Sequence, residues 1–333
     1  MSDSQVAIVT GGAGFIGSHM VDLLVDRGFV VRVIDSLVGG HERNLAQHKT
    51  NPSVSLDTRD LRGIDGSDPI YRNTKYLFHF AGLGDIVPSI EKPVEYMDTN
   101  VMATVRALEG ARANAMKRFV YAASSSCYGL ATELPTTELA PTVPQYPYAL
   151  SKFLGEQTVF HWGQVYKLPV NSIRIFNAYG PRSRTSGVYG AVFGVFLRQK
   201  LAGQAYTIVG DGTQTRDFIF VTDLARAFLA AAETEITGEV FNAGAGNPQS
   251  VNRLVELLGG EQITHVPKRP GEPDCTWADI SKARAKLGWE PKVSFADGVA
   301  EMLKHIDYWR DAPLWDEKSI AGATKTWFQY LQK

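Results

Sequence analysis

The sequence has little cysteine, almost no net charge and no basic segment before its first apolar run. Its 333 residues include two cysteines, Cys127 and Cys275, which are too few for a disulfide framework and lack the spacing of zinc ligands. The 34 Lys and Arg residues nearly cancel the 35 Asp and Glu residues, which argues against a broad surface for nucleic acid or anionic membranes. The first apolar run, residues 6–9, is too short for a signal peptide or a membrane span. We therefore expect a cytoplasmic protein that binds neither nucleic acid nor membrane.

Histidine is also too scattered for a metal site. The seven histidines show no ligand spacing along the chain, so no metal is expected. By contrast, 44% of the residues are apolar, which is enough to bury a large core in one big domain or two unequal ones.

A glycine-rich turn follows the first apolar run, which is itself a predicted strand. Gly11, Gly14 and Gly17 have the spacing G-x-x-G-x-x-G and lead into a helical pattern. Two such glycines let the backbone turn and approach a pyrophosphate, and the third lets the helix lie close to its strand. A second predicted strand, residues 29–34, ends at Asp35, which is placed to accept from a ribose 2′-hydroxyl and to repel a 2′-phosphate. The stretch predicts a dinucleotide site that favours NAD over NADP.

Three later segments are apolar enough to be buried strands: residues 54–57, 76–80 and 118–123. The first leads to Asp60, a candidate adenine contact, and the second to Ala81 and Gly82, where small residues let the backbone pass close to a cofactor. The third delivers Ser124. Because open parallel sheets bind ligands at the carboxyl ends of their strands, these residues are expected to border one crevice.

Residues 147–152 carry the strongest candidate for chemistry. If this segment is helical, Tyr148 and Lys152 stand at i and i+4 on one face. A free phenol has a pKa of about 10, too high for a general base near neutral pH, and an adjacent ammonium lowers it. Tyr148 could then take a proton from a substrate hydroxyl that Ser124 holds in line. A Tyr-x-x-x-Lys pair also occurs by chance on amphipathic helices, so this interpretation depends on the dinucleotide motif before it.

Several motifs together resemble one family. They are the Gly11 to Gly17 turn with Asp35, the Ser-Ser-Ser-x-Tyr-Gly run at 124–129, Tyr148-x-x-x-Lys152, and residues 174–177 and 210–218. The combination resembles the extended short-chain dehydrogenase/reductases, and most of all their nucleotide-sugar epimerases of the UDP-galactose 4-epimerase type. This resemblance implies an α/β fold, with a Rossmann-like doubly wound parallel sheet and a smaller C-terminal α/β substrate-binding cap. It places an NAD-binding domain at 1–175, to which about 217–243 return, and a nucleotide-sugar cap at 176–216 and 244–333.

The resemblance also implies roles for individual residues. Tyr148 would be the base, Lys152 its partner and a ligand of the nicotinamide ribose, and Ser124 the hydroxyl that holds the sugar O4. The implied NAD ligands are Gly11, Gly14, Phe15, Ile16, Asp35, Ser36, Gly40, Asp60, Leu61, Phe80, Ala81, Gly82, Asn100, Ala122, Tyr148, Lys152 and Phe176. The implied ligands of a UDP-linked sugar are Ser124, Ser125, Ser126, Tyr148, Asn177, Arg184, Val192, Thr207, Val209, Arg216, Arg269, Glu272 and Thr276. A solvated surface position remains open for Arg216 and Arg269, and a cap or core hydrogen bond for Asn100.

The implied reaction inverts C4 of a nucleotide hexose through a transient 4-keto sugar, with hydride passing to NAD and back, so no net oxidation occurs. Dehydratases of the family carry an Asp-Glu pair where this chain has Ser125 and Ser126, so the elimination of water lacks its expected acid. Thr276 falls where a small side chain admits N-acetyl sugars, while Arg182 and Arg184 leave a UDP-glucuronate-type substrate open.

Two other functions stay open, a simple NAD-dependent oxidoreductase that releases a keto product and a non-catalytic dinucleotide sensor. A homodimer is expected by analogy, because relatives pair the helices that begin here near Tyr96 and Tyr148. The aromatic tail, residues 308–315 and 327–331, lies beyond the resemblance. We expect it to cover the cap or another subunit.

Overall fold

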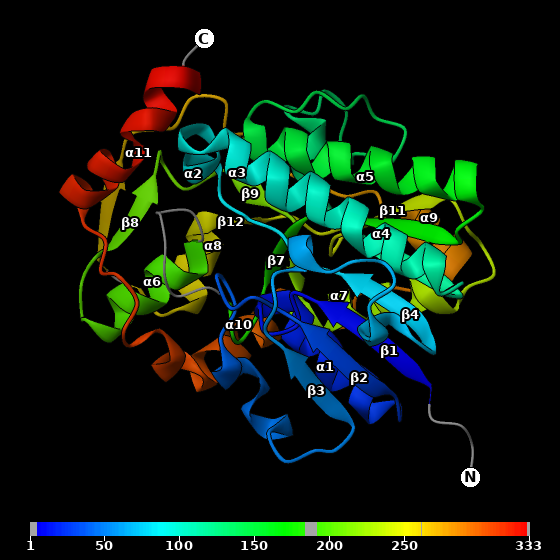
Figure 1. The fold of residues 1–333 in the computed structure, drawn as a ribbon. Helices are drawn as coiled ribbons and strands as arrows, with labels where there is room; N and C mark the ends of the chain where they lie inside the picture. Colours follow the sequence, from blue (N-terminus) through cyan, green and yellow to red (C-terminus); the bar gives the residue numbers. More distant parts are fainter. Residues whose placement is uncertain (1–4, 184–191, 261, 332–333) are drawn as a thin grey trace.

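The structure is a computed structural model that describes residues 5–183, 192–260 and 262–331. Its largest element is a seven-stranded parallel sheet (Figure 1). In spatial order the strands are β11 (Glu239–Ala243), β6 (Val170–Ile175), β5 (Arg118–Ser124), β4 (Thr74–His79), β1 (Val6–Thr10), β2 (Val30–Ile34) and β3 (Val54–Asp57). The chain runs outward from β1 to β3 and then crosses to β4 on the other side of β1. This reversal opens a crevice at the carboxyl ends of β1 and β4, where such sheets bind ligands.

Helices cover both faces of the sheet (Figure 1). On one face, α1 (Phe15–Asp26) and α7 (Val221–Glu233) pack together over a core that includes Met20 and Phe228. On the other face, α4 (Ala103–Ala113) and α5 (Pro147–Tyr166) lie side by side. The predicted Rossmann-like doubly wound fold is confirmed.

The chain leaves the sheet after β6 and returns to it later. Strand β11 pairs with β6 at the edge of the sheet, and α7 packs on α1. Helix α9 (Ser281–Leu287) and Trp289 also contribute to the core around α1 and α7. The division into two domains stays a prediction, but this packing draws residues near 280–289 to the side of the sheet rather than to the cap.

A smaller α/β region adjoins the carboxyl edge and has its own core, which includes Phe196, Ile208 and Trp309. Its strands form short pairs: β7 (Asn177–Tyr179) with β10 (Phe218–Phe220), β9 (Thr215–Arg216) with β12 (Gln249–Ser250), and β8 (Tyr206–Val209) with β13 (Ile263–Val266). Its helices are α6 (Val192–Leu201), α8 (Val251–Leu257), α10 (Phe295–Lys304) and α11 (Glu317–Leu331). This arrangement agrees with the predicted cap.

The helix expected to begin near Tyr96 is interrupted. Short helices α2 (Ile86–Glu91) and α3 (Pro93–Met97) precede a wide π turn, Asp98–Met102, and α4 follows it. Asn100 lies in this turn, where its amide donates to the Leu83 carbonyl and the Ser151 hydroxyl and accepts from the Leu83 amide. The turn thus fixes the backbone just after β4. This is the core hydrogen bonding that the sequence left open for Asn100.

Within the described ranges, no helix is long and apolar enough to cross a bilayer, and no group of three or more His, Cys, Asp or Glu side chains could hold a metal ion. His79 is a core residue between the hydroxyls of Thr10 and Thr104. Burial lowers its pKa to about 3, so it is uncharged at neutral pH.

Candidate active site

The glycine turn between β1 and α1 is packed too closely for side chains. Gly11 has a φ of +69°, and a Cβ there would lie 2.7 Å from the nitrogen of Ala81, two residues after β4. A Cβ at Gly17 would lie 2.2 Å from the Gly11 carbonyl oxygen. Gly14 is the N-cap of α1 and has no side chain to satisfy the first N–H groups of the helix. The turn therefore offers helix N–H donors and a positive dipole end to an anion, as a pyrophosphate requires.

Asp35 follows β2 and ties two loops together. Its carboxylate accepts from the Ala13 and Leu37 amides, each at 2.9 Å. A Cβ at Gly40 would lie 2.7 Å from the same carboxylate, so a larger residue at this position would displace the acid. Burial raises the pKa of Asp35, and the backbone donors oppose that rise. Because a carboxylate has about four lone-pair sites, Asp35 retains acceptor capacity for ribose hydroxyls.

The other expected NAD ligands lie around the ends of the sheet strands. Phe15 and Ile16 begin α1, Ser36 follows Asp35, Ala122 lies in β5, and Phe80, Ala81 and Gly82 follow β4. Leu61 is buried. The Asp60 carboxylate pairs with Arg62 at 2.6 Å, so any adenine contact there competes with an ion pair that the sequence did not reveal.

Helix α5 places the candidate catalytic pair as its sequence predicts. Pro147 is the first helical residue, and Tyr148 and Lys152 follow one turn apart on the buried side. Ser124 ends β5, and its hydroxyl lies 2.8 Å from that of Ser126. A side-chain hydrogen bond also joins Ser124 and Tyr148.

The pKa of Tyr148 shifts in the opposite direction from the one expected. Burial raises it above the usual phenol value, and the hydrogen bond to Ser124 offsets only part of the rise. Burial also lowers the pKa of Lys152 to about 7, so the positive charge that should favour the phenolate is partly lost at neutral pH. The Lys152 amine lies over the Tyr121 ring, 4.5 Å from its centroid, and near Gly82. Sequence position alone does not reveal this desolvation.

A cavity of about 440 Å³ opens beside Ser124 and Tyr148, between the sheet and the cap. It is lined by every expected substrate ligand within the described residues, namely Ser124, Ser125, Ser126, Tyr148, Asn177, Val192, Thr207, Val209, Arg216, Arg269, Glu272 and Thr276. Arg184 lies outside the described residues. Phe176, an expected NAD ligand, also lines this cavity and so stands at the boundary of the two expected sites.

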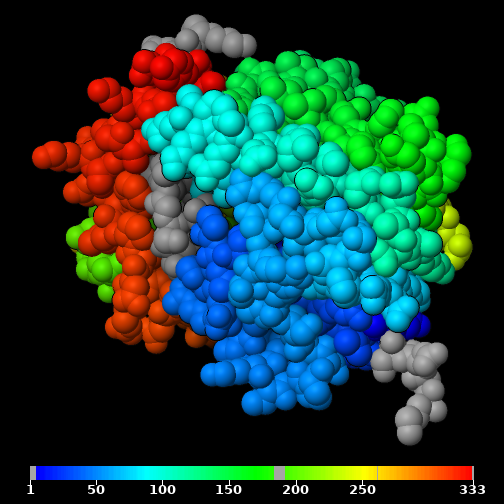
Figure 2. Space-filling view, viewed as in Figure 1, coloured from blue at the N-terminus to red at the C-terminus, as the bar shows by residue number. Residues whose placement is uncertain are grey.

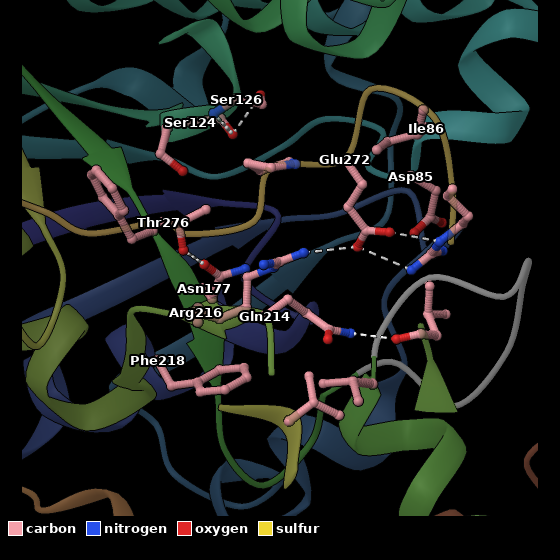
Figure 3. A pocket seen from close by; sticks show the side chains of 18 of the residues that line it. Asp85, Ile86, Ser124, Ser126, Asn177, Gln214, Arg216, Phe218, Glu272 and Thr276 are labelled. Carbon is pink, nitrogen blue, oxygen red and sulfur yellow. Dashed lines mark hydrogen bonds and ion pairs between the residues drawn. The ribbon is translucent and has the colours of Figure 1, made fainter. Parts of the chain in front are cut away.

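Two arginines in the cavity share one carboxylate (Figure 3). Glu272 accepts from Arg216 at 2.9 Å and from Arg269 at 2.8 Å. The side chains of both arginines are about 11% exposed, which excludes the solvated surface position that the sequence left open. Guanidinium groups so placed match the oxygens of a diphosphate.

Thr276 and Asn177 form another polar contact in Figure 3. The Thr276 hydroxyl donates to the Asn177 side-chain oxygen at 2.7 Å and accepts from the Asp217 amide. Thr276 is therefore a small side chain held in one orientation at the cavity wall.

Asp85, Tyr146 and Trp327 are among the cavity-lining residues that the sequence did not single out. The rings of Tyr146 and Tyr148 stack with centroids 6.4 Å apart. Because Tyr146 lies only two residues before Tyr148, its sequence position could have indicated that it lies near the base. Arg182, in contrast, pairs with Asp22 of α1 at 2.7 Å and does not line this cavity.

Comparison with known proteins decides the family. The family model described as GDP-mannose 4,6 dehydratase matches residues 8–302. The chain belongs to the extended short-chain dehydrogenase/reductase family of NAD-dependent nucleotide-sugar epimerases and dehydratases. A putative UDP-glucose 4-epimerase of Methanocaldococcus jannaschii is 35% identical over 304 residues, which cover 89% of this chain and 96% of that relative.

Solved members of this epimerase and dehydratase family share the fold closely. The UDP-N-acetylglucosamine 4-epimerase of Methanobrevibacter ruminantium, in complex with UDP-N-acetylmuramic acid, matches with a TM-score of 0.87 at 31% identity and covers 92% of this chain and 99% of its own. The UDP-glucuronic acid 4-epimerase of Bacillus cereus, in complex with UDP-glucuronic acid and NAD, matches with a TM-score of 0.84 at 31% identity and covers 91% and 99%. Because these relatives act on different UDP-sugars at similar identity, the family alone does not choose the sugar.

Proposed function

We propose that this chain is an NAD-dependent epimerase that inverts C4 of a UDP-hexose, either UDP-glucose and UDP-galactose or their N-acetylated forms. The observation that carries the proposal is one cavity that holds Ser124 and Tyr148 beside Arg216 and Arg269. A base and a pair of anion-binding groups within one enclosure suit a sugar whose reacting hydroxyl and diphosphate must both be held.

The residues of the chain divide the chemistry between them. The Tyr148 phenolate takes the proton of the sugar 4-hydroxyl, and Ser124 holds that hydroxyl in line. Bound NAD⁺ would supply the hydride acceptor and donor for C4, and the positive charge of its nicotinamide ring would lower the pKa of Tyr148. Arg216 and Arg269 hold the diphosphate while the uncharged sugar ring turns over, so that C4 presents its other face.

The cofactor site fits NAD rather than NADP. The helix N–H donors after Gly14 suit a pyrophosphate, and the buried Asp35 carboxylate suits free ribose hydroxyls. A 2′-phosphate would meet this carboxylate directly. Gly40 has no side chain, and a Cβ there would lie 2.7 Å from the Asp35 carboxylate, so the glycine leaves the acid in place.

The two serines after Ser124 favour epimerisation over dehydration as the reaction. Ser125 and Ser126 line the cavity where the dehydratases carry their acidic pair, and a hydroxyl cannot donate a proton as a carboxylic acid does. A UDP-glucuronate-type substrate is supported less, because Arg182 is paired with Asp22 of α1 rather than turned into the cavity.

A homodimer through α4 and α5 is also part of the proposal. Apolar side chains on and beside these helices are exposed in the single chain, including Met102 at 49%, and Leu150 and Leu154 at 38% each. Burial of such a surface against a second copy would remove them from water. Light scattering of the purified protein would test it.

The test is to incubate the purified protein separately with UDP-glucose, UDP-N-acetylglucosamine and UDP-glucuronate, with and without added NAD, and to analyse the products by NMR. We expect the 4-epimer of one of the first two sugars without net NADH. Tyr148→Phe should reduce turnover roughly 10²–10⁴-fold, because it removes the base and leaves the cavity shape. Stoichiometric NADH release would instead support a simple oxidoreductase. A 4-keto-6-deoxy product would support a dehydratase, and the absence of any reaction with nucleotide sugars would support a non-catalytic sensor.

A further inference from the structure

Helix α11 lies beyond residue 302, where the family match ends, yet it reaches back to the cavity. In Figure 2 this red segment lies against the cyan segment that contains α2, and the two helices are in contact. Trp327 of α11 is 5% exposed and lines the cavity. The C-terminal helix thus contributes a wall to the candidate site.

Trp327 makes two contacts with the loop that carries Arg269. Its indole N–H donates to the Pro270 carbonyl at 2.7 Å. The Arg269 guanidinium carbon lies 5.0 Å from the centroid of the indole ring, within range of a cation–π interaction. This loop has neither helix nor strand from residue 267 to 274, and Gly271 has a φ of +70°. The indole is therefore a restraint on an otherwise irregular segment.

The same helix is anchored on the other side of the cavity. The Thr326 hydroxyl bonds the Glu91 carboxylate of α2 at 3.0 Å, and Ile86 at the start of α2 lines the cavity. The Tyr146 ring, which stacks on that of Tyr148, lies 6.5 Å from the Trp327 ring. Helix α11 therefore spans from the catalytic side to the arginine loop.

We propose that Trp327 is a positioning residue for nucleoside diphosphate binding, which acts by holding Arg269 in the orientation that receives a phosphate. The inference rests on the proposed function, because it takes the ligand to carry a diphosphate. An arginine on an irregular loop loses side-chain freedom when it binds an anion, and an indole face that already fixes the guanidinium reduces that loss. Glu272, bound to both arginines, is the group with which a phosphate would compete.

The test compares Trp327→Phe with Trp327→Leu by titration calorimetry with UDP and with uridine. Phenylalanine keeps an aromatic face and loses the N–H, whereas leucine loses both and still fills the site with apolar atoms. We expect UDP to bind about tenfold more weakly to Trp327→Leu, with Trp327→Phe in between, and uridine to bind equally to all forms. Tyr330→Ala, 63% exposed on the same helix, is the matched control and should bind UDP as the wild type does.

A double-variant cycle separates positioning from a structural role. In an Arg269→Ala background, Trp327→Leu should cause no further loss of UDP affinity, since the residue it positions is gone. Equal losses of UDP and uridine affinity, or UDP binding by Trp327→Leu within twofold of the wild type, would overturn the inference and leave the proposed function intact. Failure of the wild type to bind UDP, GDP and dTDP would instead overturn the proposed function, and this inference with it.

Discussion

Glu156 and Glu272 both bind arginine, and their surroundings differ. Glu156 is on α5, and its side chain is 1% exposed; it binds Arg174 at 2.6 Å. Glu272 is on a cap loop, and its side chain is 20% exposed; it binds Arg216 and Arg269 at the wall of a cavity. The buried Glu156–Arg174 pair thus helps to hold the fold together. The Glu272 pairs at the cavity wall can instead be exchanged for contacts with a ligand.

Neutral side chains complete the hydrogen bonding around the Glu156–Arg174 pair. The Ser172 hydroxyl donates to its carboxylate at 2.8 Å, and Arg174 also donates to the Tyr128 hydroxyl. Tyr128 in turn donates to Asn242 of β11. These contacts link α5, which carries the candidate base, to the far edge of the sheet. A buried network of this kind positions the helix only while every member is satisfied.

The largest expected effect is that of Glu156→Ala, which leaves the Arg174 guanidinium buried without its anion. We expect it to lower the free energy of unfolding by about 3–5 kcal/mol, as measured by urea denaturation. Glu156→Gln, which keeps the shape and one acceptor oxygen, is the control and should lose less. If the free energy of unfolding of Glu156→Ala were within about 1 kcal/mol of the wild-type value, the contrast with Glu272 would be wrong, because neither ion pair would then contribute much to stability.

The local sequence pattern predicted the secondary structure around the site better than it predicted the contacts between distant residues. The Gly11 turn, the acid at Asp35 and the Tyr148–Lys152 pair each depend on neighbours within a few dozen residues, and the structure has them in the expected elements. The contact of Trp327 with Pro270 joins residues 57 apart, and no period or motif in the sequence encodes it. The raised pKa of Tyr148 was missed for a related reason, because desolvation depends on everything packed around the phenol.

A second prediction concerns Lys152, one helical turn from Glu156. Its pKa is about 7 in the folded protein, against about 10.4 for a free lysine. Between these values the unfolded chain binds the extra proton, so the stability of the wild type should rise with pH by at most about 1.4 kcal/mol per unit. Below pH 7 both states are protonated, and the cost of burying the charge is fully present and constant.

Lys152→Met removes this titration and supplies the reference. The free energy of unfolding of the wild type, minus that of Lys152→Met, should be flat below pH 7 and should increase from pH 7 to 10. Parallel stability curves for the two proteins would contradict the burial-driven pKa of Lys152. Because the Glu156 charge favours protonated Lys152, the rise should begin at a lower pH in Glu156→Gln.

The smallest effect is expected from Glu272→Ala, the counterpart of the first substitution. Although the arginine side chains are only about 11% exposed, both line the cavity, so water can reach their guanidinium groups when the carboxylate is removed. We expect a loss of about 1 kcal/mol or less in urea denaturation, several-fold below that of Glu156→Ala. High salt should reduce the loss further, since chloride can screen the two guanidinium groups. A loss as large as that of Glu156→Ala would mean that Glu272 also holds the fold together. A substrate phosphate could then not replace it without unfolding the loop that carries Arg269.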